Sequence, residues 1–378
     1  MKILITGANG FIGKNLIVEL KNKGYQDLYL CARNTTAAEL EQYTSDCDFV
    51  FHLAGINRPL TEEEFHTGNV QFTETLLQLL KKQNNKAPII FASSKQAMQE
   101  NAYGKSKLSA EQALLEYEKE APDKVFIYRL SNVFGKWCKP NYNSVVATFC
   151  HNIAHDLSIQ IHNESSELNL IYIDDIIEEW ISLLEGVTIR PALDHRYYIH
   201  TIHQTTLGKL AEIIESFKES RRNLQASDMS DALVKKLYST YLTYLPEEEF
   251  SYPLKMNVDQ RGSFTEILKA DSFGQVSVNI SKPGITKGNH WHHTKTEKFL
   301  VVSGQGIIRF RKLVTDDCTE EEQQILEYYV SGEKLEVIDI PPGYTHNITN
   351  IGTSDLVTIM WANESFNQDK PDTYFLEV

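Results

Sequence analysis

Short apolar runs alternate with amphipathic stretches along the first 240 residues of the chain. The apolar runs have the length of buried β-strands and lie at 2–6, 28–32, 48–53, 88–93 and 124–129. Stretches such as 11–23 and 207–222 carry apolar residues at helical spacing. Strand and helix in alternation indicate βαβ units, so a parallel sheet covered by helices on both faces is predicted up to about residue 240.

The pattern changes near residue 244, where two prolines flank three consecutive glutamates. This segment, 244–252, has the composition of a linker. Beyond it, glycine and proline turns separate short β-rich runs at 275–280, 297–303 and 306–311. Regularly spaced short strands are typical of an antiparallel barrel or sandwich. We therefore expect an α/β domain over 1–243 and an all-β barrel over 253–378.

Length and composition agree with this division. A chain of 378 residues fits two domains at roughly 100–200 residues each. Acidic residues outnumber basic ones by 51 to 37, and the formal charge of −14 argues against nucleic acid or an anionic membrane as a partner. No apolar segment approaches the roughly 18–20 residues of a membrane helix, and the N-terminal apolar run is too short for a signal peptide. We expect a soluble, cytoplasmic protein.

The five cysteines follow neither a CxxC pattern nor a regular spacing. They are Cys31, Cys47, Cys138, Cys150 and Cys318. An odd and scattered set fits reduced thiols that pack as small core residues better than a disulfide framework or a cysteine zinc site. The acidic run 320–322, close to the last of them, is expected in an exposed loop or a short helix.

Three glycines at a spacing of three stand where the first predicted strand gives way to the first helix, in the segment 6–13, TGANGFIG. Such glycines permit a tight turn and a close approach of the backbone to a pyrophosphate, and the helix N-terminus favours the phosphates. A turn without a ligand is the alternative, but the position at the first strand–helix junction favours a dinucleotide. The residues expected to contact this cofactor are Gly7, Asn9, Gly10, Phe11, Ile12 and Gly13.

The end of the second predicted strand indicates which dinucleotide is bound. An acidic residue there would accept a hydrogen bond from the ribose 2′-hydroxyl of NAD. The chain has Arg33 instead, and a guanidinium can hold a 2′-phosphate with two hydrogen bonds. NADP(H) is therefore the expected cofactor, with a surface arginine that pairs with nearby acids as the alternative.

A tyrosine and a lysine lie four residues apart in the segment 103–107, YGKSK, and share one face of a helix. An ammonium near a phenol favours the phenolate, so Lys107 is expected to lower the pKa of Tyr103 and to assist proton transfer to or from a sugar oxygen. YxxxK alone is common by chance. Here it follows a strand that ends in Ser93 and Ser94, in a chain that opens with the glycine motif. This context predicts a reductive dyad.

With these motifs, residues 1–240 resemble the extended short-chain dehydrogenases/reductases, Rossmann-like enzymes that act largely on nucleotide-linked sugars. The resemblance includes HLAG at 52–55, FASS at 91–94, RLSNVFG at 129–135 and YIDDI at 172–176. It implies that Ser94 hydrogen-bonds the substrate oxygen, that Tyr103 is the general acid and that Lys107 orients the nicotinamide ribose. It further implies cofactor contacts at Leu53, Ala54 and Gly55, and nucleotide-sugar contacts at Asn132, Asn141 and Ser144.

One departure from this family narrows the chemistry. Sugar-nucleotide 4,6-dehydratases of the family have an acidic pair after the serine or threonine, which supplies the acid and base for elimination of water. This chain has Lys95 and Gln96 at those positions, and neither side chain suits that work. The resemblance therefore implies a simple keto reduction.

Histidines and a glutamate recur in the second half of the chain with the spacing of a metal site. The segment 284–304 matches G(X)5HXH(X)4E(X)6G, and 341–350 matches PxGxxHxxxN. Strand alternation places the two histidines of HXH on one inward face, while the glutamate returns on the next strand and the last histidine comes from a distant one. Three imidazoles and one carboxylate suit zinc or another first-row divalent metal. The expected ligands are His290, His292, Glu297 and His346.

These motifs resemble the metal cupins, apart from Leu335 where a turn glycine often opens the second motif. The chain as a whole resembles the CapF-type enzymes of capsular polysaccharide synthesis, including 259–264 at the start of the cupin and 371–374 near its end. The resemblance implies zinc-dependent C3 epimerisation of UDP-2-acetamido-2,6-dideoxy-hexos-4-ulose in the cupin. It further implies NADPH-dependent C4 reduction to UDP-2-acetamido-2,6-dideoxy-L-talose, on the route to UDP-N-acetyl-L-fucosamine, by a homodimer.

The order of the two reactions follows from carbonyl chemistry. The C3 proton is acidic only while the C4 ketone exists, and a metal that polarises this ketone stabilises the enolate. Epimerisation therefore precedes reduction. Three residues, His293, Lys298 and Tyr344, stay open as the acid and base of the epimerisation.

Two other functions also stay open. In one, the cupin is a structural or dimerisation module and the chain only reduces a UDP-4-ketosugar, so loss of metal would lower stability and leave the ketone chemistry intact. In the other, the chain is a non-catalytic NADP-sensing protein whose cupin binds sugar as a regulator. Sensors of this fold commonly lose the tyrosine–lysine pair, so the presence of Ser94, Tyr103 and Lys107 argues against the second.

Overall fold

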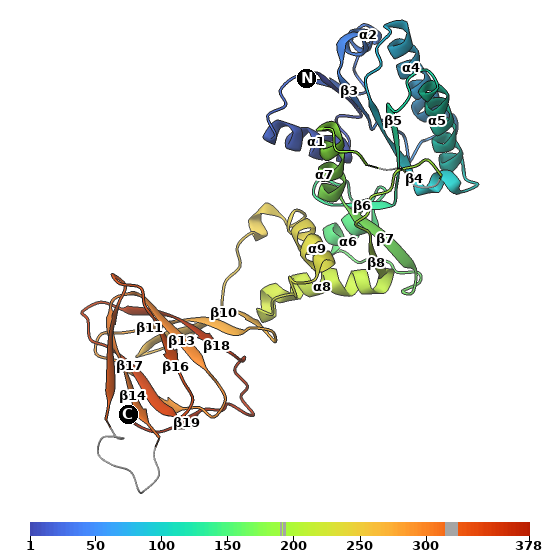
Figure 1. Ribbon diagram of the computed structural model, residues 1–378. Helices are drawn as coiled ribbons and strands as arrows, with labels where there is room; N and C mark the ends of the chain where they lie inside the picture. The colour runs from blue at the N-terminus through green and yellow to red at the C-terminus, as the bar shows by residue number, and fades with distance from the viewer. Residues whose placement is uncertain (190, 192–193, 314–323) are drawn as a thin grey trace. The chain divides into compact units, whose positions relative to one another are not determined.

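The structure, a computed structural model, describes residues 1–378 apart from 190, 192–193 and 314–323 (Figure 1). Cys318 and the acidic run 320–322 lie outside the described residues. The described chain divides into two units, Met1–Glu215 with Met229–Glu247 and Ser216–Asp228 with Glu248–Val378. The domain boundaries expected at 243 and 253 stay predictions.

Parallel strands form the central sheet of the first unit, in the order β2-β1-β3-β4-β5. They are β1 (Ile3–Thr6), β2 (Leu28–Cys31), β3 (Phe49–His52), β4 (Ile89–Ser94) and β5 (Val125–Leu130). Each lies within one residue of a predicted run, because a strand that is buried on both faces is a continuous apolar segment. Since the strands are parallel, their carboxyl ends meet at one edge of the sheet, which includes Thr6, His52 and Ser94.

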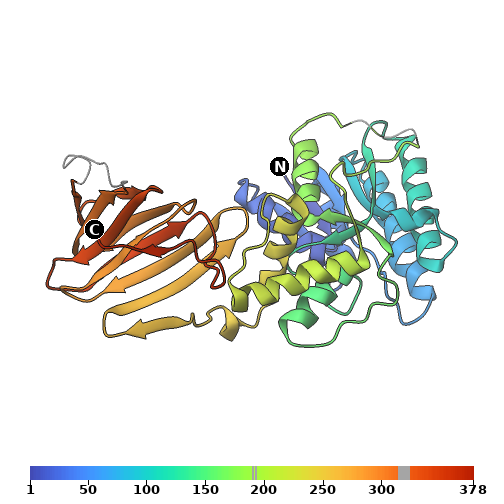
Figure 2. The same cartoon turned by 90° about the horizontal axis from the view of Figure 1, so that it is seen from below.

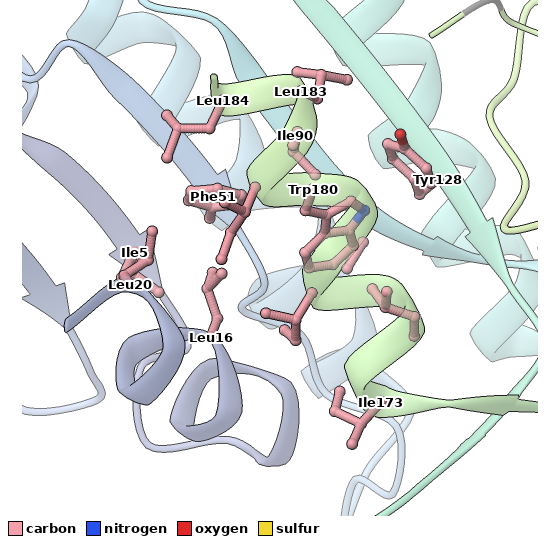
Figure 3. Close-up of a cluster of buried hydrophobic side chains, with 14 of the residues drawn as sticks. Ile5, Leu16, Leu20, Phe51, Ile90, Tyr128, Ile173, Trp180, Leu183 and Leu184 are labelled. Carbon is pink, nitrogen blue, oxygen red and sulfur yellow. The ribbon is translucent and has the colours of Figure 1, made fainter. Parts of the chain in front are cut away.

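Helices cover both faces of this sheet, because successive residues of each strand point to opposite faces. On one face, Ile5 belongs to a core with Leu16 of α1 (Phe11–Asn22) and Trp180 of α7 (Ile173–Leu184), as Figure 3 shows. On the other face, Leu4 belongs to a core with side chains from three helices. These are α2 (Ala37–Asp46), α4 (Phe72–Lys82) and α5 (Ala102–Glu118). The cores on the two faces fix the position of the strands, and thereby of the predicted site at their carboxyl ends.

Strand and helix alternate as expected up to α8, but the expectation of one parallel sheet up to about residue 240 is wrong beyond β5. The next strands form a separate sheet in the order β6-β7-β8, in which β8 is antiparallel to β7. The elements of this region are β6 (Asn132–Phe134), α6 (Val145–Ala154), β7 (Glu167–Tyr172), β8 (His203–Thr206), α8 (Leu207–Asn223) and α9 (Ala232–Leu242). The described residues between α8 and α9 contain no strand, and α9 packs on α6. Apolar periodicity here comes from helices that pack on helices.

Short helical segments complete the described part of the chain. They are α3 (Glu63–Phe65), the π-helical η1 (His66–Gln71), η2 (Lys95–Met98) and η3 (Glu247–Glu249). None of the described helices combines the length and the apolar character needed to cross a membrane.

Antiparallel strands in two sheets form the second unit (Figure 2). The strand orders are β16-β13-β18-β11-β10-β9 and β15-β14-β17-β12-β19. The strands are β9 (Met256–Asp259), β10 (Gly262–Ala270), β11 (Gly274–Ser281), β12 (Thr286–Trp291), β13 (Glu297–Ser303), β14 (Gln305–Lys312), β15 (Leu326–Ser331), β16 (Val337–Ile340), β17 (Tyr344–Asn350), β18 (Leu356–Ala362) and β19 (Tyr374–Phe375). Phe299 and Val301 of one sheet share an apolar core with Ile308 and Ile348 of the other. The predicted class, a Rossmann-like α/β part followed by an all-β cupin barrel, is confirmed.

Candidate functional site

The turn between β1 and α1 brings backbone atoms closer together than a side chain permits. Gly7 has a φ of 69°, and a Cβ on it would lie 2.8 Å from the backbone nitrogen of Ala54. A Cβ on Gly13 would lie 2.5 Å from the carbonyl oxygen of Gly7. The other residues predicted here are exposed or half-buried, namely Asn9, Gly10, Phe11 and Ile12. The turn therefore presents backbone N–H groups and the positive end of the α1 dipole to an anion.

The segment after β3, also predicted to contact the cofactor, is held by a single hydroxyl group. The Oγ1 atom of Thr6 accepts hydrogen bonds from the backbone nitrogens of Leu53 and Ala54, both at 3.1 Å. Gly55 follows, and a Cβ on it would lie 3.1 Å from Nζ of Lys107. The two predicted cofactor segments and the predicted dyad therefore meet at the same edge of the sheet.

His52 fixes the orientation of that hydroxyl group. Its Nδ1 lies 2.8 Å from Oγ1 of Thr6, and its Nε2 lies 2.9 Å from Oγ1 of Thr73. Because Thr73 donates its own proton to the carbonyl oxygen of Asn69, it accepts from Nε2, and Thr6 donates to Nδ1. Burial, with a smaller effect of the Lys107 charge, lowers the pKa of His52 to about 3. The ring is neutral and supports the cofactor segment, a role that the motif HLAG alone did not reveal.

Arg33 lies exposed just after β2, beside the glycine turn. The two segments are joined by a hydrogen bond from the backbone nitrogen of Ala8 to the carbonyl oxygen of Cys31, at 3.2 Å. Within the described chain Arg33 takes part in no ion pair. The guanidinium group is therefore available to an anion, and its alternative role as a partner of nearby acids finds no support in the described residues.

The N-terminus of α5 places Tyr103 next to Ser94. Asn101 caps the helix, since its Oδ1 accepts a hydrogen bond from the backbone nitrogen of Gly104 at 2.7 Å. Gly104 lets the helix pack tightly on the segment before it, because a Cβ there would lie 2.6 Å from the carbonyl oxygen of Gln99. Ser94 lies near enough to Tyr103 to affect the pKa of its phenol. The glycine inside YGKSK is thus a steric requirement of the site.

The pKa of Tyr103 departs from the expected direction. Burial is the largest effect and raises the pKa of Tyr103, whereas the nearby hydroxyl of Ser94 lowers it. The expectation that Lys107 lowers this pKa is wrong, because the Lys107 ammonium donates instead to the carbonyl oxygen of Ala92 at 2.9 Å. A raised pKa keeps the phenol protonated at neutral pH, which is the state that a general acid needs.

Lys107 is buried beneath the same edge of the sheet. Its Nζ lies 4.8 Å from the centre of the Phe91 ring. Burial lowers the pKa of Lys107 to about 8, and the nearby carboxylate of Glu111 opposes this shift. The side chain is therefore charged at neutral pH and loses its proton in mildly alkaline solution.

The four predicted metal ligands converge in the second unit. His290 lies in β12, His292 follows that strand, Glu297 begins β13 and His346 lies in β17. Strands β12 and β17 are antiparallel neighbours that pair His290 with His346. One ligand atom from each of the four side chains lies within 4.8 Å of the others. The Oε2 atom of Glu297 is 3.3 Å from Nε2 of both His292 and His346.

The donor atoms of this cluster fit a divalent metal. Both ring nitrogens of the buried His346 lack a hydrogen bond within the described chain. His292 donates its Nδ1–H to the carbonyl oxygen of Asp372 at 2.6 Å, so its Nε2, which lies 3.3 Å from Oε2 of Glu297, is the nitrogen that can bind a metal. Burial lowers the pKa of His290 to about 4. Burial alone would raise the pKa of Glu297, but the neighbouring His292 and His346 keep the pKa of this carboxyl group well below its usual range. Neutral imidazoles and a carboxylate are the forms that bind zinc.

A cavity of about 660 Å³ opens at this cluster. His290, Glu297 and His346 line it, together with Lys287 and Lys295. Three of the four predicted ligands therefore face a space that a substrate can enter.

The three residues left open as the acid and base of epimerisation do not line this cavity. His293 is exposed and contacts the rings of Trp291 and Tyr374 edge to face. Lys298 is exposed and pairs with Asp339. Tyr344 packs beside Phe310. The sequence spacing near the ligands did not distinguish side chains that face the cavity from those that face away.

Comparison with known proteins adds an independent observation. Residues 3–188 match the NAD dependent epimerase/dehydratase family, and residues 257–374 match the polysaccharide biosynthesis C-terminal domain. The chain is 42% identical over 378 residues to the UDP-2-acetamido-2,6-beta-L-arabino-hexul-4-ose reductase of Pseudomonas aeruginosa, with 100% of this chain and 99% of the relative covered. It is 52% identical, over 100% of both chains and with a TM-score of 0.92, to the crystal structure of the capsular polysaccharide assembling protein CapF from Staphylococcus aureus. The chain belongs to the CapF family.

The predicted resemblance to CapF-type enzymes is thereby confirmed. A CapF structure with the inhibitor 3-isopropenyl-tropolone is 48% identical over 100% of both chains, with a TM-score of 0.88. A UDP-glucuronic acid 4-epimerase of Bacillus cereus is 22% identical and covers 66% of this chain with a TM-score of 0.53, which shows a shared fold alone.

In this CapF-family chain, three residues are predicted to contact the nucleotide sugar, and the structure shows the exposure or the local hydrogen bonds of each. Asn132 is exposed in β6. Asn141 has a φ of 53°, and its backbone nitrogen donates to Oγ1 of Thr148 at 3.0 Å. Ser144 caps α6 by accepting from the backbone nitrogen of Ala147 at 3.3 Å. Their contact with the substrate stays a prediction.

A buried charged cluster lies behind the dyad of this CapF-family chain, and it was not predicted. Glu111, one turn after Lys107 in α5, accepts from Oγ of Ser93 at 2.5 Å, from two nitrogens of Arg129 at 2.8 and 3.0 Å and from Nε of Arg196 at 2.8 Å. The cluster ties α5 to β4 and β5. The helical spacing between Lys107 and Glu111 was a signal in the sequence for Glu111. No such signal exists for Arg196, which is 85 residues from Glu111 in sequence.

Proposed function

We propose that this CapF-family chain is a bifunctional UDP-sugar enzyme of capsular polysaccharide synthesis. Its cupin part inverts C3 of UDP-2-acetamido-2,6-dideoxy-hexos-4-ulose, and its first unit then reduces C4 with NADPH. The product is UDP-2-acetamido-2,6-dideoxy-L-talose, on the route to UDP-N-acetyl-L-fucosamine. The names of two relatives support this proposal, since one is a reductase of a UDP-linked hexul-4-ose and the other a capsular polysaccharide assembling protein.

The reduction depends on three side chains at the edge of the parallel sheet. When bound, NADPH supplies the hydride for the C4 carbon. Tyr103 donates the proton of its Oη to the C4 oxygen, and its raised pKa keeps that proton in place until the reaction. The hydroxyl of Ser94 hydrogen-bonds the same oxygen and orients it. Lys107 holds the nicotinamide ribose, while Arg33 binds the 2′-phosphate of the cofactor.

The epimerisation depends on the cluster in the cupin. When bound, the divalent metal, proposed to be Zn²⁺, polarises the C4 ketone and makes the C3–H bond acidic. The imidazoles of His290, His292 and His346 and the carboxylate of Glu297 hold the metal. The C3 proton leaves on one face of the sugar and a proton returns on the other. This step precedes reduction, because the C3–H bond is no longer acidic once C4 carries a hydroxyl group.

One observation supports a catalytic cupin over a structural one. Three of the four predicted ligands line a cavity of about 660 Å³. Structural metal sites are closed by their protein ligands, whereas catalytic sites keep a side open to substrate. The volume lies in the range of pockets that take small ligands. The open side therefore favours the bifunctional enzyme over a reductase with a structural cupin.

Proton exchange on the 4-keto UDP-sugar tests the proposal. The sugar is incubated in D2O without NADPH, and deuterium at C3 is followed by NMR. Metal-loaded protein is compared with chelated protein and with His290→Ala. We expect deuterium at C3 only in the metal-loaded protein. No exchange in any sample, together with normal NADPH consumption, would leave a single-function reductase.

The family resemblance also leads us to propose a homodimer. Sedimentation velocity tests this directly, because the particle mass that it gives is twice that of one chain for a dimer. A mass equal to one chain at micromolar concentration would contradict the proposal.

A further inference from the structure

Three cationic side chains line the metal cavity, and two of them are already paired. Arg261 donates to Asp259, with Nη2 and Nε at 2.6 and 3.0 Å from the same carboxylate oxygen. Lys287 donates to Oδ1 of Asn279 and to the carbonyl oxygen of Ile280, each at 2.8 Å, and to a further carbonyl oxygen at 3.4 Å. These three contacts use every hydrogen of the Lys287 ammonium.

Lys295 is the third cation, and its ammonium has no such partner. The residue is 8% exposed, and within the described chain its Nζ makes no hydrogen bond or ion pair. It lines the same cavity as His290, Glu297 and His346, and its charge acts on His290. An ammonium without a protein acceptor takes one from solvent or from a ligand. Its position at an open site points to a ligand oxygen as the missing partner.

The backbone around Lys295 is held by a residue from far along the chain. The carboxylate of Asp372 accepts hydrogen bonds from the backbone nitrogens of His293, Thr294 and Lys295, at 3.0, 2.9 and 2.9 Å. The carbonyl oxygen of Asp372 accepts from Nδ1 of His292 at 2.6 Å. One residue therefore orients a metal ligand and also the loop that carries the unpaired lysine.

We propose that Lys295 is a catalytic residue of the epimerisation, an inference that rests on the proposed function, and that Asp372 is its positioning residue. As the C3–H bond breaks, its electron pair forms a C3–C4 double bond, negative charge gathers on the C4 oxygen and the proton passes to water. Lys295 donates a hydrogen bond to that oxygen and keeps its three protons throughout. A proton from water then returns to C3 on the opposite face, and the C4 carbonyl forms again.

Substitution of Lys295 separates this role from metal binding. Lys295→Met removes the charge at nearly constant length, and Lys298→Met removes an exposed charge outside the cavity as a matched control. We expect Lys295→Met to lower kcat for C3 deuterium exchange by about 100-fold, with KM and bound zinc unchanged. We expect Lys295→Arg to retain most of the exchange, because it retains the charge, and Lys298→Met to match the wild-type protein.

Contrary results distinguish the inference from the proposed function. Exchange at the wild-type rate in Lys295→Met, or a rise in KM alone, overturns the inference and leaves the proposed function standing. Loss of zinc from Lys295→Met, or Lys295→Arg as slow as Lys295→Met, also overturns it, because the role is then structural or does not depend on charge. No exchange in the wild-type protein overturns the proposed function and the inference with it.

Asp372→Asn tests the positioning role with a readout that does not depend on activity. The amide nitrogen of asparagine accepts no hydrogen bond, so part of the contact with the backbone of 293–295 is lost. We expect faster amide hydrogen exchange at 293–295 by mass spectrometry, together with a lower kcat for C3 exchange. Unchanged amide exchange in this loop would overturn the positioning role of Asp372.

Discussion

Removal of the Glu111 carboxylate tests whether the buried charged cluster supports the dyad. Glu111 is fully buried between Arg129 and Arg196, whose side chains are 10% and 8% exposed. Glu111→Gln leaves the buried Arg196 without a carboxylate partner and leaves Arg129 with Asp194 alone, at 3.3 Å. We expect the free energy of unfolding of the first unit to fall by about 3 kcal/mol, the lower end for a buried ion pair that loses one partner, because the amide oxygen still accepts a hydrogen bond.

The same change acts on Lys107, one helical turn away. Burial lowers the pKa of Lys107 to about 8, and the negative charge of Glu111 opposes that shift. Without this charge the pKa falls below 8, so the ammonium loses its proton at a lower pH. In the wild-type protein, kcat/KM for reduction is expected to fall as the pH rises through about 8. In Glu111→Gln the fall begins at a lower pH.

Two assays follow these effects. Urea unfolding read by hydrogen-exchange mass spectrometry reports on peptides of the first unit separately, and initial rates of NADPH oxidation give the pH profile. Glu116→Gln is the control, because Glu116 lies on the same helix in an exposed pair with Lys119. Its expected effect is below about 1 kcal/mol, with no change of pH profile. Equal losses of stability in both variants, or a pH profile that does not move in Glu111→Gln, would refute the reasoning.

Three further changes test the first unit. Arg33→Ala is expected to lower the preference for NADPH over NADH in kcat/KM by about 10–100-fold, since a charged hydrogen bond contributes about 1.5–3 kcal/mol; an unchanged ratio would make Arg33 a surface residue. Tyr103→Phe is expected to slow NADPH oxidation by about 10²–10⁴-fold while C3 exchange persists, and loss of both would contradict separate centres. Gly104→Ala is expected to destabilise the unit by about 1–3 kcal/mol, because the new methyl meets the Gln99 oxygen; an unshifted melting temperature would disprove this.

The parts of the site that were predictable are those whose residues lie close together along the chain. Tyr103 and Lys107 share a face because four residues make about one helical turn. Gly13 meets the backbone of Gly7 and Ala8 within one strand–turn–helix segment. The cluster of four proposed metal ligands was predictable because one local motif supplies His290, His292 and Glu297 and a second supplies His346. In each case spacing alone specifies the geometry.

The parts that were missed depend on contacts between distant segments. Arg196 reaches Glu111 across 85 residues, and Asp372 reaches His292 across 80. The pKa of Tyr103 was expected to fall because only the neighbouring lysine is visible in sequence, whereas burial depends on the packed structure. The parallel sheet was extended too far, because alternation of strands and helices does not say which sheet a strand joins or in which direction it runs.

The pairing of β19 with β12 has a consequence for biosynthesis. His290 pairs with Phe375 and Trp291 with Tyr374, while Asp372 binds the loop that follows β12. A ribosome makes β12 long before it makes these partners, so the histidines emerge before the segment that orients them. A chain that has not yet reached Asp372 lacks the acceptor for Nδ1 of His292. The arrangement of the proposed metal ligands is therefore completed only when the last residues of this unit have been made.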